Sequence, residues 1–346
     1  MIEAKTVQRR GMSVGDIEGE REEMKPGNNT RVVLVTGGCG FLASYLIPAL
    51  VAKGATVIAF DVSVPSSVSN EPKDRVHYVR GDLASEADIY RLMIKYRFTD
   101  VFHLGGLLAE VCEADPVRAF KVNFLSTLTL LDASVSLGVQ RFVMTSSISV
   151  FGQDAQEPVK DDAPKNPTTI YGQTKLASEH LLLWYARKHD LDTRGVRFAW
   201  VFGPGRKTGI TATWSSLLLD AIAEGRPVEI LNPEERGDWL YVKDAVKALL
   251  AVWQAQRPPQ RIYNIAGGVH SIREVMEIAR RYRPETKISW HRKSLYLSPY
   301  PAAYDDGPAR AELGWKPDYT IERAIKEHLD VVSSRRNPKQ VGRGAE

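Results

Sequence analysis

The feature that most constrains the fold is a short apolar segment that ends abruptly in glycines and continues as a helical pattern. Residues 31–35 are mostly apolar and β-favouring, which predicts a short buried strand, and Gly37, Gly38 and Gly40 end it at once. Apolar residues at helical spacing follow over 46–51. Strand, glycine turn and helix in this order form a unit whose helix N-terminus binds the pyrophosphate of a dinucleotide. We therefore predict a dinucleotide-binding fold in which Gly37 makes the tight turn and Gly40 allows close backbone approach.

An acidic residue follows the next predicted strand. Residues 56–60 are β-favouring, and Asp61 comes directly after them. Asp61 lies near the offset of about 20 residues at which a carboxylate binds the adenosine ribose. A carboxylate accepts hydrogen bonds from a free 2′-hydroxyl and repels a 2′-phosphate, so we predict NAD rather than NADP as the cofactor.

The chain continues as an alternation of strand-like and helical segments. Further strands are expected at 76–79, 100–104, 141–145 and 193–198, and helices at 85–96, 116–137 and 171–189. Repeated βα units predict a doubly wound α/β fold, in which helices cover both faces of a parallel sheet.

The predicted domains follow from this alternation. We expect an NAD-binding Rossmann domain over 31–198 and a smaller, mainly substrate-binding subdomain over 199–330, with return segments to the sheet. The last third of the chain suits a subdomain because it mixes short segments with prolines and loops. Polar composition predicts a flexible extension at 1–30 and a polar tail at 331–346.

Tyr171 and Lys175 are the first catalytic candidates. Residues four apart on a helix share a face, so the lysine ammonium is expected beside the phenol. A nearby cation favours the phenolate and lowers its pKa, which would allow Tyr171 to act as a base near neutral pH. The same four-residue spacing also occurs on ordinary solvated helix faces. The catalytic interpretation therefore depends on the glycine loop in the same chain.

Several segments match, in order, the motifs of one enzyme family. They are residues 36–42, 81–83, 103–106, 122–123, 145–152, 203–205 and 313–317. The chain resembles the extended short-chain dehydrogenase/reductase family, in the epimerase/dehydratase branch that includes the nucleotide-sugar epimerases. The likeness runs from about residue 31 to about residue 330, and the shared order of the motifs makes it specific.

The resemblance implies a catalytic set of Ser147, Tyr171 and Lys175. Tyr171 would remove a hydroxyl proton while hydride leaves the same carbon, and Ser147 would hold the oxygen. Lys175 would hold the nicotinamide ribose and lower the pKa of Tyr171. The implied cofactor-binding residues are Gly37, Gly40, Phe41, Leu42, Asp61, Asp82, Leu83, Leu104, Gly105, Gly106, Asn123, Tyr171 and Lys175. We expect no metal site.

The substrate side departs from the nucleotide-sugar members. The 4,6-dehydratases carry an acid after the active-site hydroxyl residue, whereas Ile148 follows here, so we do not expect a dehydratase. Trp200 stands where the epimerases have an asparagine that contacts the diphosphate. A glycine, Gly237, also follows the potential phosphate ligand Arg236.

Two other segments favour a small substrate. Residues 103–110 and 209–213 resemble those of threonine and four-carbon sugar-acid dehydrogenases, and Arg206 or Lys207 could bind a carboxylate or phosphate. The candidate substrate-binding residues are Leu108, Ser147, Ser149, Trp200, Arg206, Thr211 and Arg236. We predict a net NAD-dependent dehydrogenase acting on a sugar-like or hydroxy-acid substrate. The alternatives are a UDP-sugar 4-epimerase and a non-catalytic dinucleotide sensor.

Composition narrows the setting of this chemistry. The 346 residues are 43% hydrophobic and carry 46 basic and 42 acidic side chains, which gives no sign of a nucleic-acid partner. No apolar run approaches a membrane span, and two cysteines suit a reducing cytoplasm. We expect a cytoplasmic location, and the family resemblance implies a role in carbohydrate metabolism.

The two long predicted helices suggest self-association. Helices 116–137 and 171–189 are more apolar than one sheet face requires, and their counterparts pair with a symmetry mate in many relatives. The residues concerned are Phe120, Phe124, Leu128, Leu131, Val135, Leu176, Leu181, Leu182, Leu183, Trp184 and Tyr185. We predict a homodimer.

Overall fold

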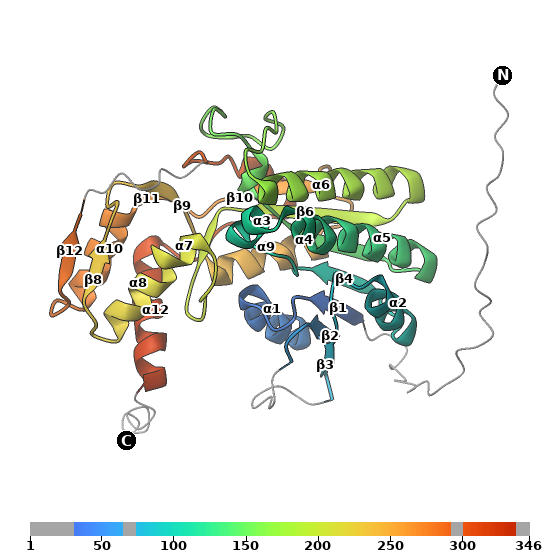
Figure 1. Cartoon of the computed structure of the whole chain (residues 1–346), viewed down its shortest axis with the longest axis horizontal. Helices are drawn as coiled ribbons and strands as arrows, with labels where there is room; N and C mark the ends of the chain where they lie inside the picture. Colours follow the sequence, from blue (N-terminus) through green and yellow to red (C-terminus); the bar gives the residue numbers. More distant parts are fainter. Residues whose placement is uncertain (1–30, 65–73, 292–299, 337–346) are drawn as a thin grey trace.

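A seven-stranded parallel sheet forms the centre of the computed structural model, which describes residues 31–64, 74–291 and 300–336 (Figure 1). Its strand order is β10-β6-β5-β4-β1-β2-β3, so the order reverses between β1 and β4. The strands are β1 (Val32–Thr36), β2 (Thr56–Asp61), β3 (Val76–Arg80), β4 (Asp100–His103), β5 (Arg141–Ser147), β6 (Asp192–Phe198) and β10 (Ile262–Ile265). This confirms the predicted doubly wound α/β fold.

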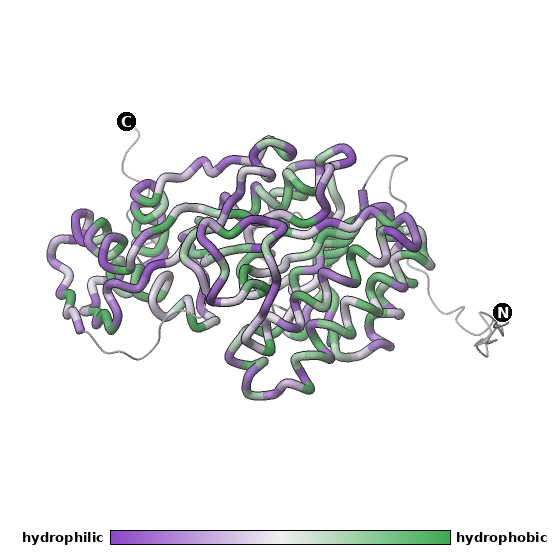
Figure 2. Tube along the Cα trace, turned by 90° about the horizontal axis from the view of Figure 1, so that it is seen from above, coloured by the Kyte–Doolittle hydropathy of each residue, from purple (hydrophilic) through white to green (hydrophobic). Residues whose placement is uncertain are grey.

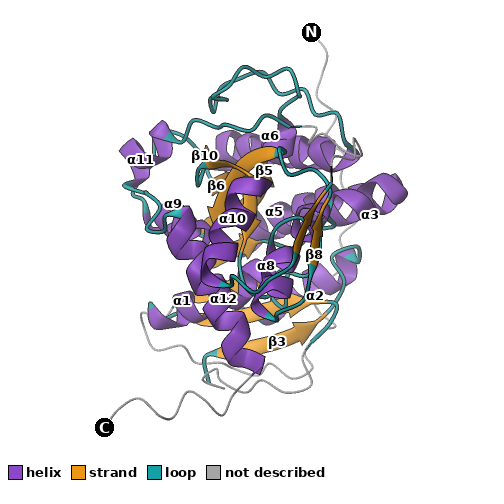
Figure 3. Ribbon diagram, turned by 90° about the vertical axis from the view of Figure 1, so that its left-hand side faces the viewer, coloured by secondary structure: helices purple, strands orange, loops and turns teal. Residues whose placement is uncertain are grey.

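Helices cover both faces of the sheet (Figure 3). Along β1, Val33 and Val35 join a core with α1 (Phe41–Ala52) and α9 (Val242–Gln254). Val32 and Leu34 point to the opposite face and join a second core. That second core is completed by α2 (Glu86–Lys95), α5 (Ser126–Leu137) and α6 (Ile170–His189). Figure 2 shows the apolar stretches running through the interior between these layers.

The helix expected at 116–137 is divided into three parts. It comprises α4 (Pro116–Ala119), a π-helical turn η2 (Phe120–Leu125) and then α5. The side chains of Ser126 and Thr127 donate to the carbonyls of Val122 and Asn123 at 2.5 and 2.7 Å. Hydrogen bonds of this kind are a known source of helix distortion. A short helix α3 (Ala109–Ala114), which was not predicted, precedes α4.

Two small sheets and several helices lie beyond β6 in the chain. A three-stranded sheet has the order β11-β9-β7, and a two-stranded sheet pairs β12 with β8. The strands are β7 (Trp200–Phe202), β8 (Val228–Ile230), β9 (Arg236–Tyr241), β11 (Val269–Ser271) and β12 (Ile288–Trp290). The helices are α7 (Ile210–Thr213), α8 (Ser216–Ala223), α10 (Ile272–Tyr282), α11 (Gly307–Leu313) and α12 (Ile321–Arg336).

Two predicted boundaries can be compared with these elements. β10 pairs with β6 in the large sheet and α9 packs against it, although both come from beyond residue 198. Residues 331–336 belong to α12 rather than to a tail, because Val332 packs inward from that helix. The expected extension at 1–30 and the rest of the tail lie outside the described residues. Within the described part, none of the helices is both long and apolar enough to cross a bilayer.

Candidate active site

A cavity of about 450 Å³ opens at the carboxyl ends of the central strands. Residues at or just after the ends of β1, β2, β4, β5 and β6 line it, beside the switch point of the strand order. Ligands of doubly wound folds bind at this place. The predicted residues that line it are Gly37, Gly40, Phe41, Leu42, Asp61, Asp82, Leu83, Leu104, Gly105, Gly106, Leu108, Ser147, Ser149, Tyr171, Lys175, Trp200, Arg206 and Thr211.

The glycine loop has the geometry of an anion-binding turn. Gly37 adopts φ +65°, and a Cβ there would lie 2.8 Å from the Cα of Gly105, so both conformation and space require glycine. The Gly40 N–H donates to the Gly37 carbonyl at 2.9 Å. Among the described residues, no side chain caps the N-terminus of α1, so its first N–H groups remain available to a bound anion.

Asp61 faces this loop from the end of β2. Its carboxylate accepts hydrogen bonds from the Cys39 and Ser63 N–H groups, both at 3.1 Å. These contacts fix the side chain at the edge of the cavity, next to Asp82 and Leu83. Asp61 therefore occupies the place expected of a ribose-binding carboxylate.

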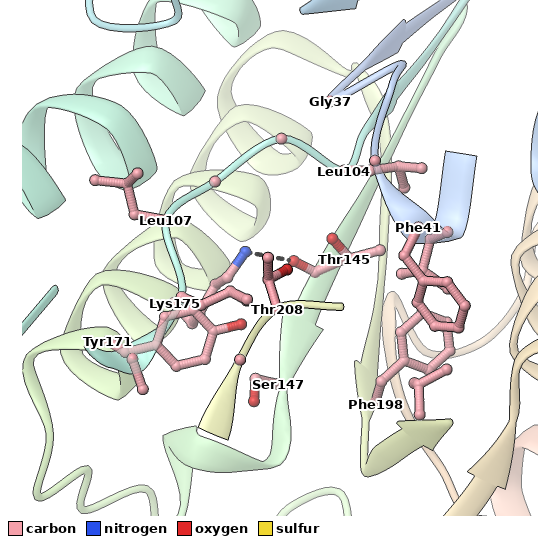
Figure 4. Close-up of a pocket in the computed structure, with 18 of the residues that line it drawn as sticks. Gly37, Phe41, Leu104, Leu107, Thr145, Ser147, Tyr171, Lys175, Phe198 and Thr208 are labelled. Carbon is pink, nitrogen blue, oxygen red and sulfur yellow. Dashed lines mark hydrogen bonds between the residues drawn. The ribbon is translucent and has the colours of Figure 1, made fainter. Parts of the chain in front are cut away.

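Ser147, Tyr171 and Lys175 converge on one side of the cavity, as Figure 4 shows. Ser147 ends β5, its hydroxyl accepts the Ser149 N–H at 3.1 Å, and the Tyr171 phenol lies on the same side of the cavity. Tyr171 lies in the first turn of α6. The Lys175 ammonium lies 5.7 Å from the centre of the Tyr171 ring and donates to the Thr145 carbonyl at 3.0 Å.

The start of α6 is held from two directions. Thr169 caps the helix by accepting the Gly172 N–H at 3.0 Å. The Glu113 carboxylate, on α3, accepts the Ile170 N–H at 2.7 Å. These bonds fix the turn that carries Tyr171.

The electrostatics of this trio differ from the sequence-based expectation. Burial raises the pKa of Tyr171 above its ordinary value, and the Ser147 hydroxyl and the Arg206 charge only partly oppose this. Burial also lowers the pKa of Lys175 to about 8, although Cys112 and Glu179 act in the opposite direction. Desolvation disfavours both charged forms, so Lys175 by itself does not bring the phenol pKa below its ordinary value.

Asn123 supports the site without lining the cavity. Its side-chain oxygen accepts the Leu107 N–H at 2.7 Å, and its amide donates to the Leu107 carbonyl at 3.1 Å and to Thr174 at 3.2 Å. The π turn η2 thus presents Asn123 to the loop that follows β4. Asn123 holds this loop in place, whereas direct cofactor contact had been expected.

The substrate side brings together most of the predicted residues. Arg206 donates to the Thr211 hydroxyl at 2.6 Å and to the Val201 carbonyl. Arg236 begins β9 and does not line the cavity, and Lys207 is exposed and also outside it. These two basic residues are therefore not brought to the site.

Several lining residues were missed. Thr208, Glu110, Phe198 and Tyr300 all border the cavity. Tyr300 comes from a segment far along the chain, and its hydroxyl lies 3.3 Å from that of Thr169. Only Arg206, beside Thr208, offered a sequence signal for this part of the wall.

One protein-family model matches the part of the chain that contains the glycine loop and the Ser147, Tyr171 and Lys175 set. The model of the NAD dependent epimerase/dehydratase family matches residues 33–266, which is more than half of the chain. The chain belongs to the NAD-dependent epimerase/dehydratase family.

Relatives within this family carry out different reactions. A UDP-glucose 4-epimerase of Mycolicibacterium smegmatis is 29% identical over 87% of this chain and 98% of its own length. A D-erythronate dehydrogenase of Cupriavidus necator is 27% identical over 86% and 98%. A solved GalE-like L-threonine dehydrogenase from Cupriavidus necator (holo form) superposes with a TM-score of 0.80 at 25% identity. It covers 87% of this chain and 99% of its own.

Membership of the NAD-dependent epimerase/dehydratase family makes this protein an NAD-dependent enzyme that acts on a small molecule. The residues present fit NAD. The glycine turn and the uncapped α1 N-terminus suit its pyrophosphate, and Asp61 suits its adenosine ribose.

Proposed function

We propose that the enzyme oxidises a secondary alcohol of a small hydroxy acid or sugar-like acid, with net reduction of NAD. The observation that carries this proposal is Arg206. Its guanidinium lines the same cavity as Tyr171 and interacts electrostatically with it. Burial lowers the pKa of Arg206 to about 10, so the cation has lost much of its hydration. A partly desolvated guanidinium favours an anionic partner, and a carboxylate matches its planar fork.

Three residues would act on the hydroxyl that reacts. Tyr171, as the phenolate, would take its proton, and Ser147 would hydrogen-bond the same oxygen and keep it in place. Lys175 would hold the cofactor ribose and counter the charge on Tyr171. The chemistry that NAD supplies when bound is the acceptance of hydride from the carbon. Because burial raises the phenol pKa, the positive nicotinamide ring is a further influence that would favour the phenolate.

Arg206 would bind the carboxylate of the substrate. Thr211 and the Val201 carbonyl hold the guanidinium from one side. Glu110 is a further charged group that interacts with Arg206, at the border of the cavity. If Arg206 binds the carboxylate while Tyr171 contacts the reacting hydroxyl, the substrate is an acid whose alcohol group lies close to its carboxyl group.

UDP-sugar 4-epimerase is the second candidate, and the full-length similarity to a UDP-glucose 4-epimerase favours it. Against it, Arg236 is outside the cavity, and the indole of Trp200 lines the wall where an amide was expected. The sensor alternative is disfavoured by family membership and by the convergence of Ser147, Tyr171 and Lys175.

A panel of sugar acids, hydroxy amino acids and UDP-sugars tests the proposal, with NADH absorbance and product analysis as readouts. We expect net NADH formation with an acid. Arg206→Lys keeps the charge but not the fork, and should raise KM for that acid at least tenfold. Lys207→Met is the matched control and should change little. Isomerised UDP-sugar without net NADH would establish the epimerase instead.

We infer that the enzyme is a homodimer joined through α4, α5 and α6. Trp184 on α6 is 45% exposed, Leu125 just before α5 is 41% exposed, and Val117 on α4 is 68% exposed. Leu131, Leu182 and Tyr185 pack into the protomer's own core, so the apolar surface left over is smaller than expected. A cytoplasmic location and a role in carbohydrate metabolism stay predictions.

A further inference from the structure

Trp200 and Gly237, two departures from the nucleotide-sugar pattern, form one packing unit. A Cβ on Gly237 would lie 2.5 Å from Cε3 and from Cη2 of Trp200. The backbone of Gly237 does not adopt a positive φ, so space rather than conformation requires glycine there. Gly237 does not line the cavity, whereas Trp200 does. The indole therefore packs directly against Gly237, and Trp200 is the member of this pair that borders the cavity.

The indole is also fixed at its edges. Trp200 is 5% exposed, and its ring centre lies 5.9 Å from that of Trp214 and 6.0 Å from that of Trp239. The backbones of Trp200 and Trp239 pair in neighbouring strands, and the Trp239 indole N–H donates to the His270 carbonyl at 3.0 Å. Aromatic pairs in such arrangements stabilise each other beyond the effect of buried area. Trp200 is therefore a rigid part of the wall.

We propose that Trp200, seated on Gly237, is the specificity residue that limits the length of the substrate. This inference rests on the proposed function, in which Arg206 binds the carboxylate and Tyr171 the reacting hydroxyl. The rest of the substrate must fit within the same cavity, which Trp200 borders. The face of an indole accepts neither a longer polyol nor a diphosphate, because it leaves their polar groups without hydrogen-bond partners. The site thus takes short hydroxy acids and rejects six-carbon acids and nucleotides.

The test measures ligand binding to the NADH-saturated protein by titration calorimetry. The probes are D-glycerate, D-erythronate, D-gluconate and UDP, which form a series of increasing size. The wild type should bind erythronate at least tenfold more tightly than gluconate or UDP. Trp200→Ala should bring gluconate or UDP to within about threefold of erythronate. Trp200→Phe retains a large ring and should keep the discrimination.

A substitution at Gly237 perturbs the position of the Trp200 indole independently of Trp200→Ala. A methyl group in Gly237→Ala displaces the indole toward the cavity, so erythronate binding should weaken at least tenfold. The double variant with Trp200→Ala removes the ring that the methyl group meets, and should restore erythronate binding and thermal stability. Unchanged discrimination in Trp200→Ala would overturn the proposal even if Gly237→Ala failed to fold.

The acid probes and UDP distinguish a failure of this inference from a failure of the proposed function. If the wild type binds no acid of the series, the proposed function fails. Only the UDP measurements then test whether Trp200 limits what the cavity accepts. UDP binding that appears only in Trp200→Ala would then still support the proposal that the Trp200 indole limits the length of the ligand. UDP binding that is equal in the wild type and Trp200→Ala would overturn it.

Discussion

Removing Arg197 should be one of the most destabilising single substitutions beneath the active site. Arg197 on β6 donates from Nε and Nη2 to the Glu179 carboxylate of α6, at 2.7 and 2.8 Å. The two side chains are only 5% and 3% exposed. The Ser146 hydroxyl donates to the same carboxylate at 2.6 Å. The pair therefore joins β5, β6 and α6, the elements that carry Ser147, Tyr171 and Lys175.

The expected magnitude follows from what each variant leaves behind. Arg197→Leu leaves the Glu179 carboxylate buried without its cation, a situation that costs about 3–5 kcal/mol. Glu179→Leu should cost less, because Arg197 retains Asp161, with Nη1 3.8 Å from a carboxylate oxygen and 3.0 Å from the carbonyl. The double variant leaves no unpaired member of this pair. Its cost should fall below the sum of the single costs by at least about 2 kcal/mol.

Urea unfolding followed by far-ultraviolet circular dichroism measures these costs, with free energies extrapolated to water. The matched control is Lys326→Leu, which breaks an exposed pair with Asp330 at 2.8 Å. Both side chains there are at least half exposed, so the loss of stability should be much smaller than that of Arg197→Leu. A cost for Arg197→Leu as small as that of the control would refute the reasoning.

Four further predictions concern the cofactor, the chemistry and the assembly. Tyr171→Phe should lower turnover by about two decades or more and leave NAD binding intact; near-normal turnover would mean that another group is the base. Asp61→Ala should narrow a preference for NAD over NADP of at least about tenfold, measured by fluorescence titration; equal affinities in the wild type would contradict its role. Because the pKa of Lys175 is lowered to about 8 in the folded protein, the unfolded state binds more protons above that pH. Stability should therefore rise with pH by about 2 kcal/mol between pH 8 and 9.5, relative to Lys175→Met; parallel curves for the two proteins would contradict the lowered pKa. Trp184→Glu should convert a dimer into a monomer in light scattering; a monomeric wild type would refute the dimer itself.

The parts of the fold that the sequence could predict are those with a strong local signal. The strand and glycine turn at Gly37 depend on neighbouring residues, and so does the alternation of later strands and helices. β5 extends to Ser147 instead of ending at 145, because strand pairing with β6 continues to Phe198. Helix boundaries shift by a residue or so for the same reason, since tertiary contacts decide where an element ends.

The parts that the sequence could not predict depend on contacts between distant residues. Tyr300 reaches the cavity from a segment far from α6, and no spacing pattern announces it. The raised pKa of Tyr171 results from burial, and the four-residue spacing between Tyr171 and Lys175 does not indicate how deeply the phenol is buried. Likewise, the sequence shows Gly237 only as a glycine after Arg236, and the structure shows that the ring of Trp200 leaves no space for a Cβ there. Local periodicity carries none of this information.

The position of β10 at the edge of the large sheet has a consequence for how the protein is made. The Asn264 N–H on β10 donates to Asp161 at 2.5 Å, and its side-chain amide donates to the Val159 carbonyl at 3.0 Å. The Asn264 side-chain oxygen in turn accepts from Arg197 at 3.3 Å. A ribosome that has released only residues up to 198 has already supplied Ser147, Tyr171 and Lys175. It has not supplied the strand that covers β6 and completes the hydrogen bonds around Arg197. The β6 edge therefore stays open until β10 has been made, and a gene fragment ending at residue 198 should yield an aggregation-prone chain.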